Sequence, residues 1–297
     1  MLETRIRTRL DAWGPDVVTA HENDELRLLW LARRWPIVYT VHDPEPHPGA
    51  PDRRNAVLRA GRAAWMRSAD HLVVHGPQLV GQLSRRAARK PTSVIPHGID
   101  VAAEPMQQPG VPTILLFGRM EPHKGVGVLA RAMEFVWRAV PNARLIVAGR
   151  GPAIGDAPTD SRADVRNRYI APMEVSGLFR SASVTVLPYT QASQSGVGLQ
   201  SIAQGVPVVV TAVGSLPELT DAPNHIVAPG DPAALATALI GALEQNQSDR
   251  WRVLEFARAK FDWTNVAKAY GRLYAEVVET HSSSASHSRE RIAPSDA

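Results

Sequence analysis

Residues 113–125 read TILLFGRMEPHKG, an apolar run of strand length followed by a loop that begins and ends with glycine. Apolar side chains recur at helical spacing beyond this loop, so the stretch predicts a strand, a loop and a helix that begins near Gly125. The loop holds two cations, Arg119 and Lys124, and Gly118 gives access to its backbone. Cations beside the N–H groups of a helix start can bind a diphosphate, although a solvated turn with two surface cations fits the spacing equally well. The order of glycine, lysine and hydroxyl that marks a Walker loop is absent.

The same alternation of short β-branched runs and longer helical segments recurs in two series, which is typical of βαβ units and parallel sheets. In the first series we expect strands at residues 16–20, 36–41, 71–74 and 93–95 and helices near 23–34, 53–68 and 77–90. In the second series we expect strands at residues 113–120, 143–149, 165–170, 184–187, 206–211 and 225–227 and helices near 125–139, 174–182, 196–204, 232–244, 249–260 and 264–280.

This pattern predicts an α/β fold with two Rossmann-like doubly wound domains. A segment rich in proline and glycine follows the last strand of the first series, so the domains should cover residues 1–108 and 109–280. The polar residues 281–297 should be disordered. Open α/β sheets bind ligands at the carboxyl ends of their strands, so we expect the ligand where the carboxyl ends of both sheets face each other.

The composition argues against several classes of protein. The 297 residues include no cysteine, which rules out disulfides and thiolate zinc sites and leaves the cytoplasm as the expected compartment. The first ten residues carry charges in place of an apolar leader, and no apolar stretch reaches the roughly 18 residues that span a bilayer. A formal net charge of +4 argues against a nucleic-acid-binding protein and is compatible with an anionic ligand or a lipid surface.

Further stretches accompany the opening loop in a fixed order along the chain. They are TVHDPEPHPG (40–49), ADHLVVHG (69–76), VIPHGID (94–100), IVAGRGP (146–152), VLPYTQASQSGVG (186–198), GVPVVVTAVGSLPEL (205–219) and FDWTNVAKAYGRLY (261–274). Together with residues 113–125 this ordered set resembles the GT-B glycosyltransferases of the retaining family 4, also called group 1.

The resemblance implies an enzyme that moves a hexose from a nucleoside diphosphate sugar to a glycan, a lipid-linked acceptor or a small acceptor. Arg119, Lys124 and Gly118 would hold the donor diphosphate, and the two cations would stabilise charge on the leaving group. His42 matches the histidine that faces the donor from the first domain, although a structural role is the alternative. Weaker matches on the acceptor side are His21, which could instead cap the next helix, together with Asp43 and His47. No Asp-x-Asp metal motif occurs, so we expect no metal and no cofactor beyond the nucleotide sugar.

The loop after residue 187 departs from the family pattern. Two glutamates that touch the donor in relatives are missing: Gln191 stands at the first position, and the second falls near Leu199 or Gln200. Glutamine forms hydrogen bonds but supplies no negative charge. The family-like residues that remain for donor binding are Ser193, Ser195, Gly196, Val197 and Glu218, the last of which could equally be an acid at a helix start.

Two interpretations of this departure stay open. Either recognition of the donor is altered and transfer survives, or the chain is a catalytically degenerate nucleotide-sugar-binding or assembly subunit that partners a complete enzyme. The resemblance also implies that the first domain is incomplete, because family members open with a strand and a glycine-rich loop that this chain lacks. Three explanations stay open: the start of the chain is assigned too late, a partner chain supplies the missing strands, or the first domain is a remnant with an unpaired sheet edge.

The segment from Arg53 to Arg67 combines five arginines with apolar residues. A basic helix with an apolar side can lie on anionic lipid, which would place the protein at the inner face of the membrane. An ordinary amphipathic helix that packs on its own sheet explains the same pattern and is favoured by the residues alone.

Overall fold

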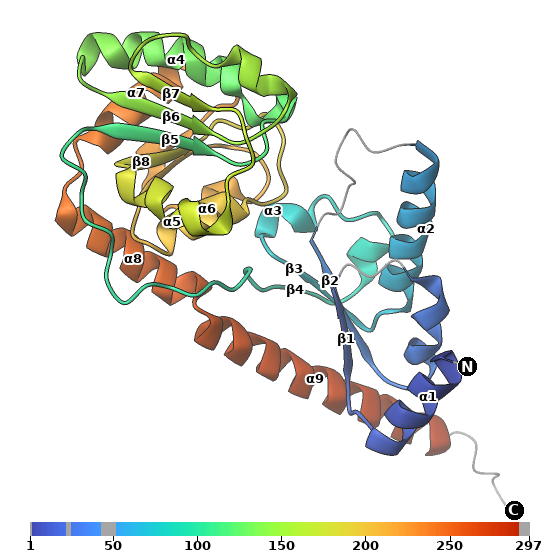
Figure 1. Cartoon of the computed structure of the whole chain (residues 1–297). Coiled ribbons are helices and arrows are strands. Elements are labelled where there is room, and N and C mark those ends of the chain that lie inside the picture. Colours follow the sequence, from blue (N-terminus) through green and yellow to red (C-terminus); the bar gives the residue numbers. More distant parts are fainter. Residues whose placement is uncertain (1, 22–24, 43–51, 291–297) are drawn as a thin grey trace, which may run out of the picture. The chain divides into compact units, whose positions relative to one another are not determined.

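The computed structural model describes residues 2–21, 25–42 and 52–290, and it divides the chain into two compact units (Figure 1). The first unit comprises residues 1–96 and 266–297, and the second comprises residues 97–265. Asp43 and His47 lie outside the described residues.

The second unit is built on a six-stranded parallel sheet in the order β10-β9-β8-β5-β6-β7. Its strands are β5 (Thr113–Phe117), β6 (Arg144–Ala148), β7 (Ala163–Arg166), β8 (Val184–Leu187), β9 (Val208–Thr211) and β10 (Ile226–Val227). Its α-helices are α4 (Val126–Ala139), α5 (Pro172–Ser181), α6 (Gly196–Ile202), α7 (Pro232–Leu243) and α8 (Gln247–Phe261). Short 3-10 turns are η3 (Pro122–Lys124), η4 (Pro152–Asp156), η5 (Leu216–Leu219) and η6 (Pro223–His225).

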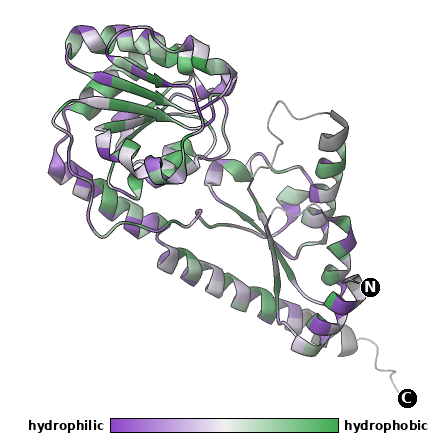
Figure 2. Cartoon of the chain, viewed as in Figure 1, coloured by the Kyte–Doolittle hydropathy of each residue, from purple (hydrophilic) through white to green (hydrophobic). Residues whose placement is uncertain are grey.

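The central strands β5, β8 and β9 are buried on both faces and are almost wholly apolar, whereas the edge strand β7 carries Asp164 and Arg166 (Figure 2). Successive side chains of a strand point to opposite faces. Leu116 therefore packs in the core beneath α4 and α7, whereas its neighbour Leu115 packs with Phe179 of α5 on the other face. Full burial of such a side chain contributes about 1.5–3 kcal/mol.

The strand order of the second unit reverses at β5. The chain first adds β6 and β7 on one side of β5 and then places β8, β9 and β10 on the other side. Ligands of open α/β sheets bind beside the carboxyl ends of the strands at such a switch point. The loops after β5 and β8, residues 118–125 and 188–195, are therefore the loops that this topology assigns to a ligand.

The first unit has a four-stranded parallel sheet in the order β1-β2-β3-β4. Its strands are β1 (Val18–His21), β2 (Ile37–Val41), β3 (His71–Val74) and β4 (Thr92–Val94). Its α-helices are α1 (Leu2–Trp13), α2 (Asp52–Ser68), α3 (Pro77–Val80) and α9 (Trp263–Glu290), with 3-10 turns η1 (Leu26–Arg33) and η2 (Ala87–Arg89). Within the described residues the strands of this sheet follow the order of the sequence without a reversal.

Two separate cores cover the faces of the four-stranded sheet. On one face Tyr39 stacks on the fully buried Trp65 of α2, with ring centroids 6.0 Å apart and planes at 10°. On the other face Val38 packs with Val266, Leu273 and other residues of α9. The C-terminal helix thus completes the layer that the first series of βα units leaves uncovered.

The division of the chain differs from the expected boundary after residue 108, because the linker and the last helix pack elsewhere. The backbone N–H groups of Ala102 and Met106 donate to carbonyls of residues 203 and 204, at 2.9 Å each, so the linker belongs to the second unit. Most of α9 instead packs on the first sheet. This helix continues to Glu290, through ten residues that we expected to be disordered, and residues 291–297 lie outside the described part of the chain.

Two helix predictions for the first unit are wrong, because neither segment forms a continuous α-helix in its described residues. The segment near 23–34 is the 3-10 turn η1, and the segment 77–90 contains only α3 and η2. Gly81 caps α3, and the Ser84 hydroxyl accepts from the N–H of Ala87 at 3.3 Å, so local turn hydrogen bonds replace a continuous helix.

Candidate functional site

The loops after β5 and β8 are locked against each other by their backbones. The N–H of Thr190 donates to the carbonyl of His123 at 2.8 Å. Gly125 adopts a left-handed conformation with φ of 71°, and a Cβ at this position would lie 1.9 Å from the carbonyl oxygen of Pro188. Only glycine meets both requirements, so the glycine that ends the loop is there to allow close approach.

A third loop, after β6, completes the same backbone framework. A Cβ on Gly149 would lie 1.7 Å from the carbonyl oxygen of Gly118, and the N–H of Met120 donates to the carbonyl of Arg150 at 3.0 Å. A Cβ on Gly118 itself would lie 3.5 Å from Val197 at the start of α6. Gly118 and Val197, both predicted to bind the donor, are therefore brought together at the carboxyl edge of the sheet.

Two cations, Arg119 and Lys124, lie in this framework, and their positive charges repel each other. Burial and the nearby charge of Arg119 lower the pKa of Lys124 from 10.5 to about 8, against a smaller opposing effect of Glu121. The Lys124 ammonium lies 3.8 Å from the ring centre of Tyr189, which partly offsets the loss of water. Arg119 itself is exposed. An anion that contacts both cations would offset the repulsion between them.

Tyr189 is a site residue that sequence reasoning missed. Its ring is fully buried, and burial raises the pKa of its hydroxyl to about 12, so the hydroxyl stays neutral at physiological pH. Its carbonyl accepts from the hydroxyl of Thr211 at 2.6 Å, which ties the loop after β8 to the end of β9. Its position directly after the strand run was the available signal.

The remaining residues of the loop after β8 fall into two groups. Ser195 is buried and caps α6, because its hydroxyl accepts from the N–H of Gly198 at 3.3 Å. The carbonyl of the buried Ser193 accepts from the N–H of Ser215 at 2.9 Å. Gln191, Gly196 and Gln200 are exposed. The two serines thus have evident structural partners, and their role toward a donor stays a prediction.

Glu218 lies in η5 and is paired with Lys260 of α8. The Lys260 ammonium contacts the Glu218 carboxylate and also donates to the Glu218 carbonyl at 3.0 Å. This pair supplies a structural role for the acid, and its role in donor binding stays a prediction. Lys260 is a second residue that sequence reasoning missed, because 42 residues separate the partners.

The first unit gathers histidines at the carboxyl ends of consecutive strands. His21 ends β1, His42 follows β2 and His75 follows β3. Nε2 of His75 lies 3.1 Å from Nδ1 of His42, and the rings of His21 and His42 have centroids 6.1 Å apart. Tyr270 of α9 lies 6.2 Å from the His21 ring. The structure therefore brings two predicted residues together and adds His75, which the sequence reasoning had not singled out.

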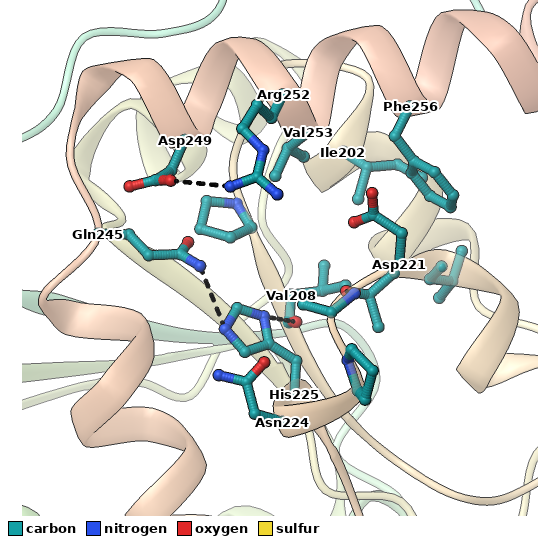
Figure 3. Close-up of a pocket in the computed structure, with 15 residues that line it drawn as sticks. Ile202, Val208, Asp221, Asn224, His225, Gln245, Asp249, Arg252, Val253 and Phe256 are labelled. Atoms are coloured by element: carbon teal, nitrogen blue, oxygen red, sulfur yellow. Dashed lines mark hydrogen bonds and ion pairs between the residues drawn. The ribbon is translucent and has the colours of Figure 1, made fainter.

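A separate cavity of about 330 Å³ lies in the second unit, beside the start of β9 (Figure 3). His225 forms part of its wall, with Nδ1 3.1 Å from the carbonyl of Val208 and Nε2 3.2 Å from the amide of Gln245. Burial lowers the pKa of His225. Asp221 and Arg252, which also line it, are largely exposed. None of the predicted site residues lines this cavity.

No cluster of three or more metal-ligating side chains occurs within residues 2–21, 25–42 and 52–290. Over the same described part of the chain, none of the helices is both long and apolar enough to cross a membrane.

The fold and the site together define a class of protein. Two parallel α/β units, with cations and close-packed glycines at the switch point of the second, have the architecture of the GT-B glycosyltransferases. Two family models match the chain in succession: "Glycosyltransferase Family 4" over residues 2–103 and "Glycosyl transferases group 1" over residues 111–245. The chain belongs to this family of glycosyltransferases, and it is an enzyme of the nucleotide-sugar-dependent hexosyltransferase class.

Curated relatives extend the similarity over most of the chain. A phosphatidyl-myo-inositol mannosyltransferase of Mycobacterium leprae (strain TN) is 29% identical over 303 residues, which cover 95% of this chain and 79% of the relative. A glycogen synthase of Mycobacterium tuberculosis (strain ATCC 25618 / H37Rv) is 27% identical over 89% of this chain and 69% of its own length.

Solved structures show the same fold at lower identity. Sucrose-phosphate synthase from Thermosynechococcus elongatus superposes with a TM-score of 0.70 at 20% identity, covering 94% of this chain and 78% of that chain. Anabaena Alr3699/HepE, solved in complex with UDP and glucose, has a TM-score of 0.65 at 17% identity, with 92% and 81% covered.

Proposed function

We propose that the protein transfers a hexose from a nucleoside diphosphate sugar, with retention of configuration, to a glycan, a lipid-linked acceptor or a small acceptor. The observation that carries this proposal is the pair of cations, Arg119 and Lys124, in a partly desolvated loop at the switch point of the second sheet. A pyrophosphate group matches such a pair in charge and offsets their mutual repulsion.

The chemistry follows from where charge develops. When the bond between the anomeric carbon and the diphosphate oxygen breaks, the electron pair passes to the leaving diphosphate. Arg119 and Lys124 stabilise this charge, and because backbone contacts hold their loop in place, little reorganisation is needed during the reaction. The reaction as proposed uses side chains alone and no metal ion.

On the first unit, His42 is proposed to contact a sugar hydroxyl and His21 to act on the acceptor side. The relatives' names support this class of donor and acceptor: they include a mannosyltransferase that acts on phosphatidyl-myo-inositol and a D-inositol 3-phosphate glycosyltransferase of Segniliparus rotundus, which is 25% identical over 70% of this chain.

The test is calorimetric titration of the full chain with UDP, GDP and ADP. We expect one nucleotide to bind, and Arg119→Ala and Lys124→Ala each to weaken its binding by about 10-fold or more, the effect of losing one charged hydrogen bond. Arg180→Ala, which removes an exposed arginine of α5, is the matched control and should leave the affinity unchanged. Unchanged affinity in both loop variants would reject this diphosphate site.

A second candidate function is binding without transfer, as a subunit beside a complete enzyme. It is favoured by Gln191, which is exposed and neutral at the position of a family carboxylate. The two candidates differ in turnover: with the matching nucleotide sugar and an acceptor screen, a transferase forms glycosylated product and releases nucleotide. Tight nucleotide binding with no product, and with no loss of sugar from the donor, would favour the binding subunit.

A peripheral lipid contact through α2 is a further proposal. Trp65 is buried on the sheet, as an ordinary amphipathic helix requires, while Arg59, Arg67 and Val57 are exposed. Sedimentation with vesicles of anionic lipid tests this contact: Arg59→Gln with Arg67→Gln should abolish co-sedimentation, and equal binding to neutral vesicles would reject it.

A further inference from the structure

His75 forms a chain of two hydrogen bonds that joins a backbone carbonyl to His42. Its Nδ1 lies 2.8 Å from the carbonyl oxygen of Ile95, and its Nε2 lies 3.1 Å from Nδ1 of His42. The His75 ring is 8% exposed and lies 4.6 Å from the His42 ring, between centroids. The three residues come from the ends of three adjacent strands of the first sheet.

The positions of the protons follow from the carbonyl at the end of this chain. A carbonyl oxygen can only accept, so Nδ1 of His75 carries a proton and donates to Ile95. In a neutral imidazole the other nitrogen is then an acceptor, so Nε2 of His75 accepts from His42. The proton of neutral His42 must therefore sit on Nδ1, which leaves its lone pair on Nε2.

This tautomer determines what His42 can do. With the lone pair on Nε2, that atom accepts a hydrogen bond from a hydroxyl group; in the opposite tautomer it would donate one. A sugar hydroxyl can donate or accept, so the tautomer of His42 decides the direction of this hydrogen bond. A buried partner that sets the tautomer of a reactive imidazole is a recognised way to prepare it for such a contact.

We propose that His75 is a positioning residue that holds neutral His42 in the Nδ1–H tautomer and orients its Nε2 as the acceptor for a sugar hydroxyl. The part that concerns the hydroxyl rests on the proposed role of His42, whereas the tautomer does not. The tautomer follows from two hydrogen bonds, one between His75 and the carbonyl of Ile95 and one between His75 and His42.

The tautomer is measured directly by long-range ¹H–¹⁵N correlation of the histidine rings in the ¹⁵N-labelled full chain, about two pH units above the ordinary imidazole pKa of about 6.5. A His42→Gln variant assigns the His42 signals. We expect His42 as the Nδ1–H tautomer in the unmodified protein. In His75→Leu, which removes the acceptor, we expect a shift toward the Nε2–H form.

Two controls accompany this measurement. His225 faces the carbonyl of Val208 through Nδ1 and should keep its own tautomer in every variant, because it lies in the other unit. In His75→Gln the side-chain amide can donate to Ile95 and accept from His42, so this variant should restore the Nδ1–H signal of His42. An Nε2–H tautomer of His42 in the unmodified protein, or no change in a folded His75→Leu variant, overturns the proposal.

Kinetics test the hydroxyl contact separately. His75→Leu should lower kcat by about 10-fold or more, while His75→Gln should stay within about 3-fold of the unmodified enzyme. The Kd of the nucleoside diphosphate should stay unchanged in both variants, because Arg119 and Lys124 are intact. If the unmodified protein binds nucleotide but shows no transfer, the proposed function fails while the tautomer result still decides the role of His75.

Discussion

Both sheets place polar groups at the carboxyl ends of their parallel strands, but these groups are held in place by different kinds of contact. In the second unit, glycines let three loops approach through their backbones, and two cations are held in that framework. In the first unit, imidazoles lie at consecutive strand ends: His42 and His75 share a hydrogen bond, and the ring of His21 lies beside that of His42. A cationic loop held by backbone contacts suits a polyanion of fixed geometry, whereas a set of imidazoles suits hydroxyl groups.

The difference in topology accompanies the difference in chemistry. The second sheet reverses its strand order at β5, which opens space beside two neighbouring strand ends, while the first sheet runs in sequence order through its described strands. We therefore expect nucleotide affinity to depend on the second unit alone and turnover to depend on both.

The largest effect is expected from Gly125→Ala, which disrupts the close approach between the loops after β5 and β8 of the second unit. The added methyl group would meet the Pro188 carbonyl in a left-handed conformation that alanine avoids, so unfolding free energy should fall by about 3 kcal/mol and nucleotide affinity by about 100-fold. Thermal unfolding and calorimetry measure both quantities. Gly127→Ala is the control, because its Cβ would lie 3.7 Å from the nearest atom. Equal tolerance at both positions would contradict the close-approach explanation.

A pH series tests the cations of the second unit. Below about pH 8 Lys124 is charged in the free protein, so its titration should not make the affinity for the diphosphate depend on pH. Above pH 8 this affinity should fall by up to about 10-fold per pH unit, because Lys124 loses its charge in the free protein. Arg119→Ala should move the onset to higher pH, because the charge of Arg119 helps to lower the pKa of Lys124. Calorimetric titrations at several pH values measure this, and an affinity independent of pH through this range would exclude contact with Lys124.

The same pKa predicts an opposite trend in the ligand-free protein. The folded pKa of Lys124 is about 8 and the unfolded one about 10.5, so between these values the unfolded state binds more protons and stability rises with pH. The rise should be absent in Lys124→Gln, and denaturant unfolding of both proteins isolates the difference. The same pH dependence of stability in the two proteins would show that the charged form of Lys124 is not disfavoured by its surroundings.

A smaller effect separates the two possible roles of Glu218. If the acid acts only through its ion pair, Glu218→Gln and Lys260→Met should each lower stability by about 1 kcal/mol and leave nucleotide-sugar affinity unchanged. If it also binds the donor, Glu218→Gln alone should weaken the donor by several-fold. Paired unfolding and binding measurements on both variants distinguish these outcomes.

The smallest effect is expected from Gln191→Glu, which restores the family carboxylate on an exposed loop position. The KM for the donor sugar should change by about 3- to 10-fold, with the Kd of the nucleoside diphosphate unchanged, because the carboxylate would meet the sugar hydroxyls. Gln194→Glu adds the same charge three residues away and serves as the control. An identical effect of both substitutions would indicate a general charge effect on the loop.

Much of the second unit could be predicted from sequence, because its signals are local. The run TILLF predicted β5 and the spacing of Val126, Leu129 and Met133 predicted α4, both within one to three residues. The first unit was predicted less well: the segment 77–90 has helical composition, yet a glycine and a serine hydroxyl give its backbone alternative hydrogen bonds. The packing of α9 on the first sheet was also missed, because the strands that its apolar side chains contact lie far away in the sequence.

The candidate site shows the same limit. Gly118, Arg119 and Lys124 were predicted as a group because they lie within seven residues of each other. His75 was missed although a signal existed: it follows a strand as His21 and His42 do. The pairing of Glu218 with Lys260 carried no local signal.

The sequence by itself determined the class of fold, the order of its elements and the cationic loop, since hydrophobic period and the spacing of glycines and charges are properties of neighbouring residues. Only the tertiary structure decided that the strand order reverses at β5, that Lys124 is desolvated beside Arg119, and that His75 lies within hydrogen-bond distance of His42. Each of these depends on atoms from separate strands, because burial, repulsion and hydrogen bonding act across space and not along the chain.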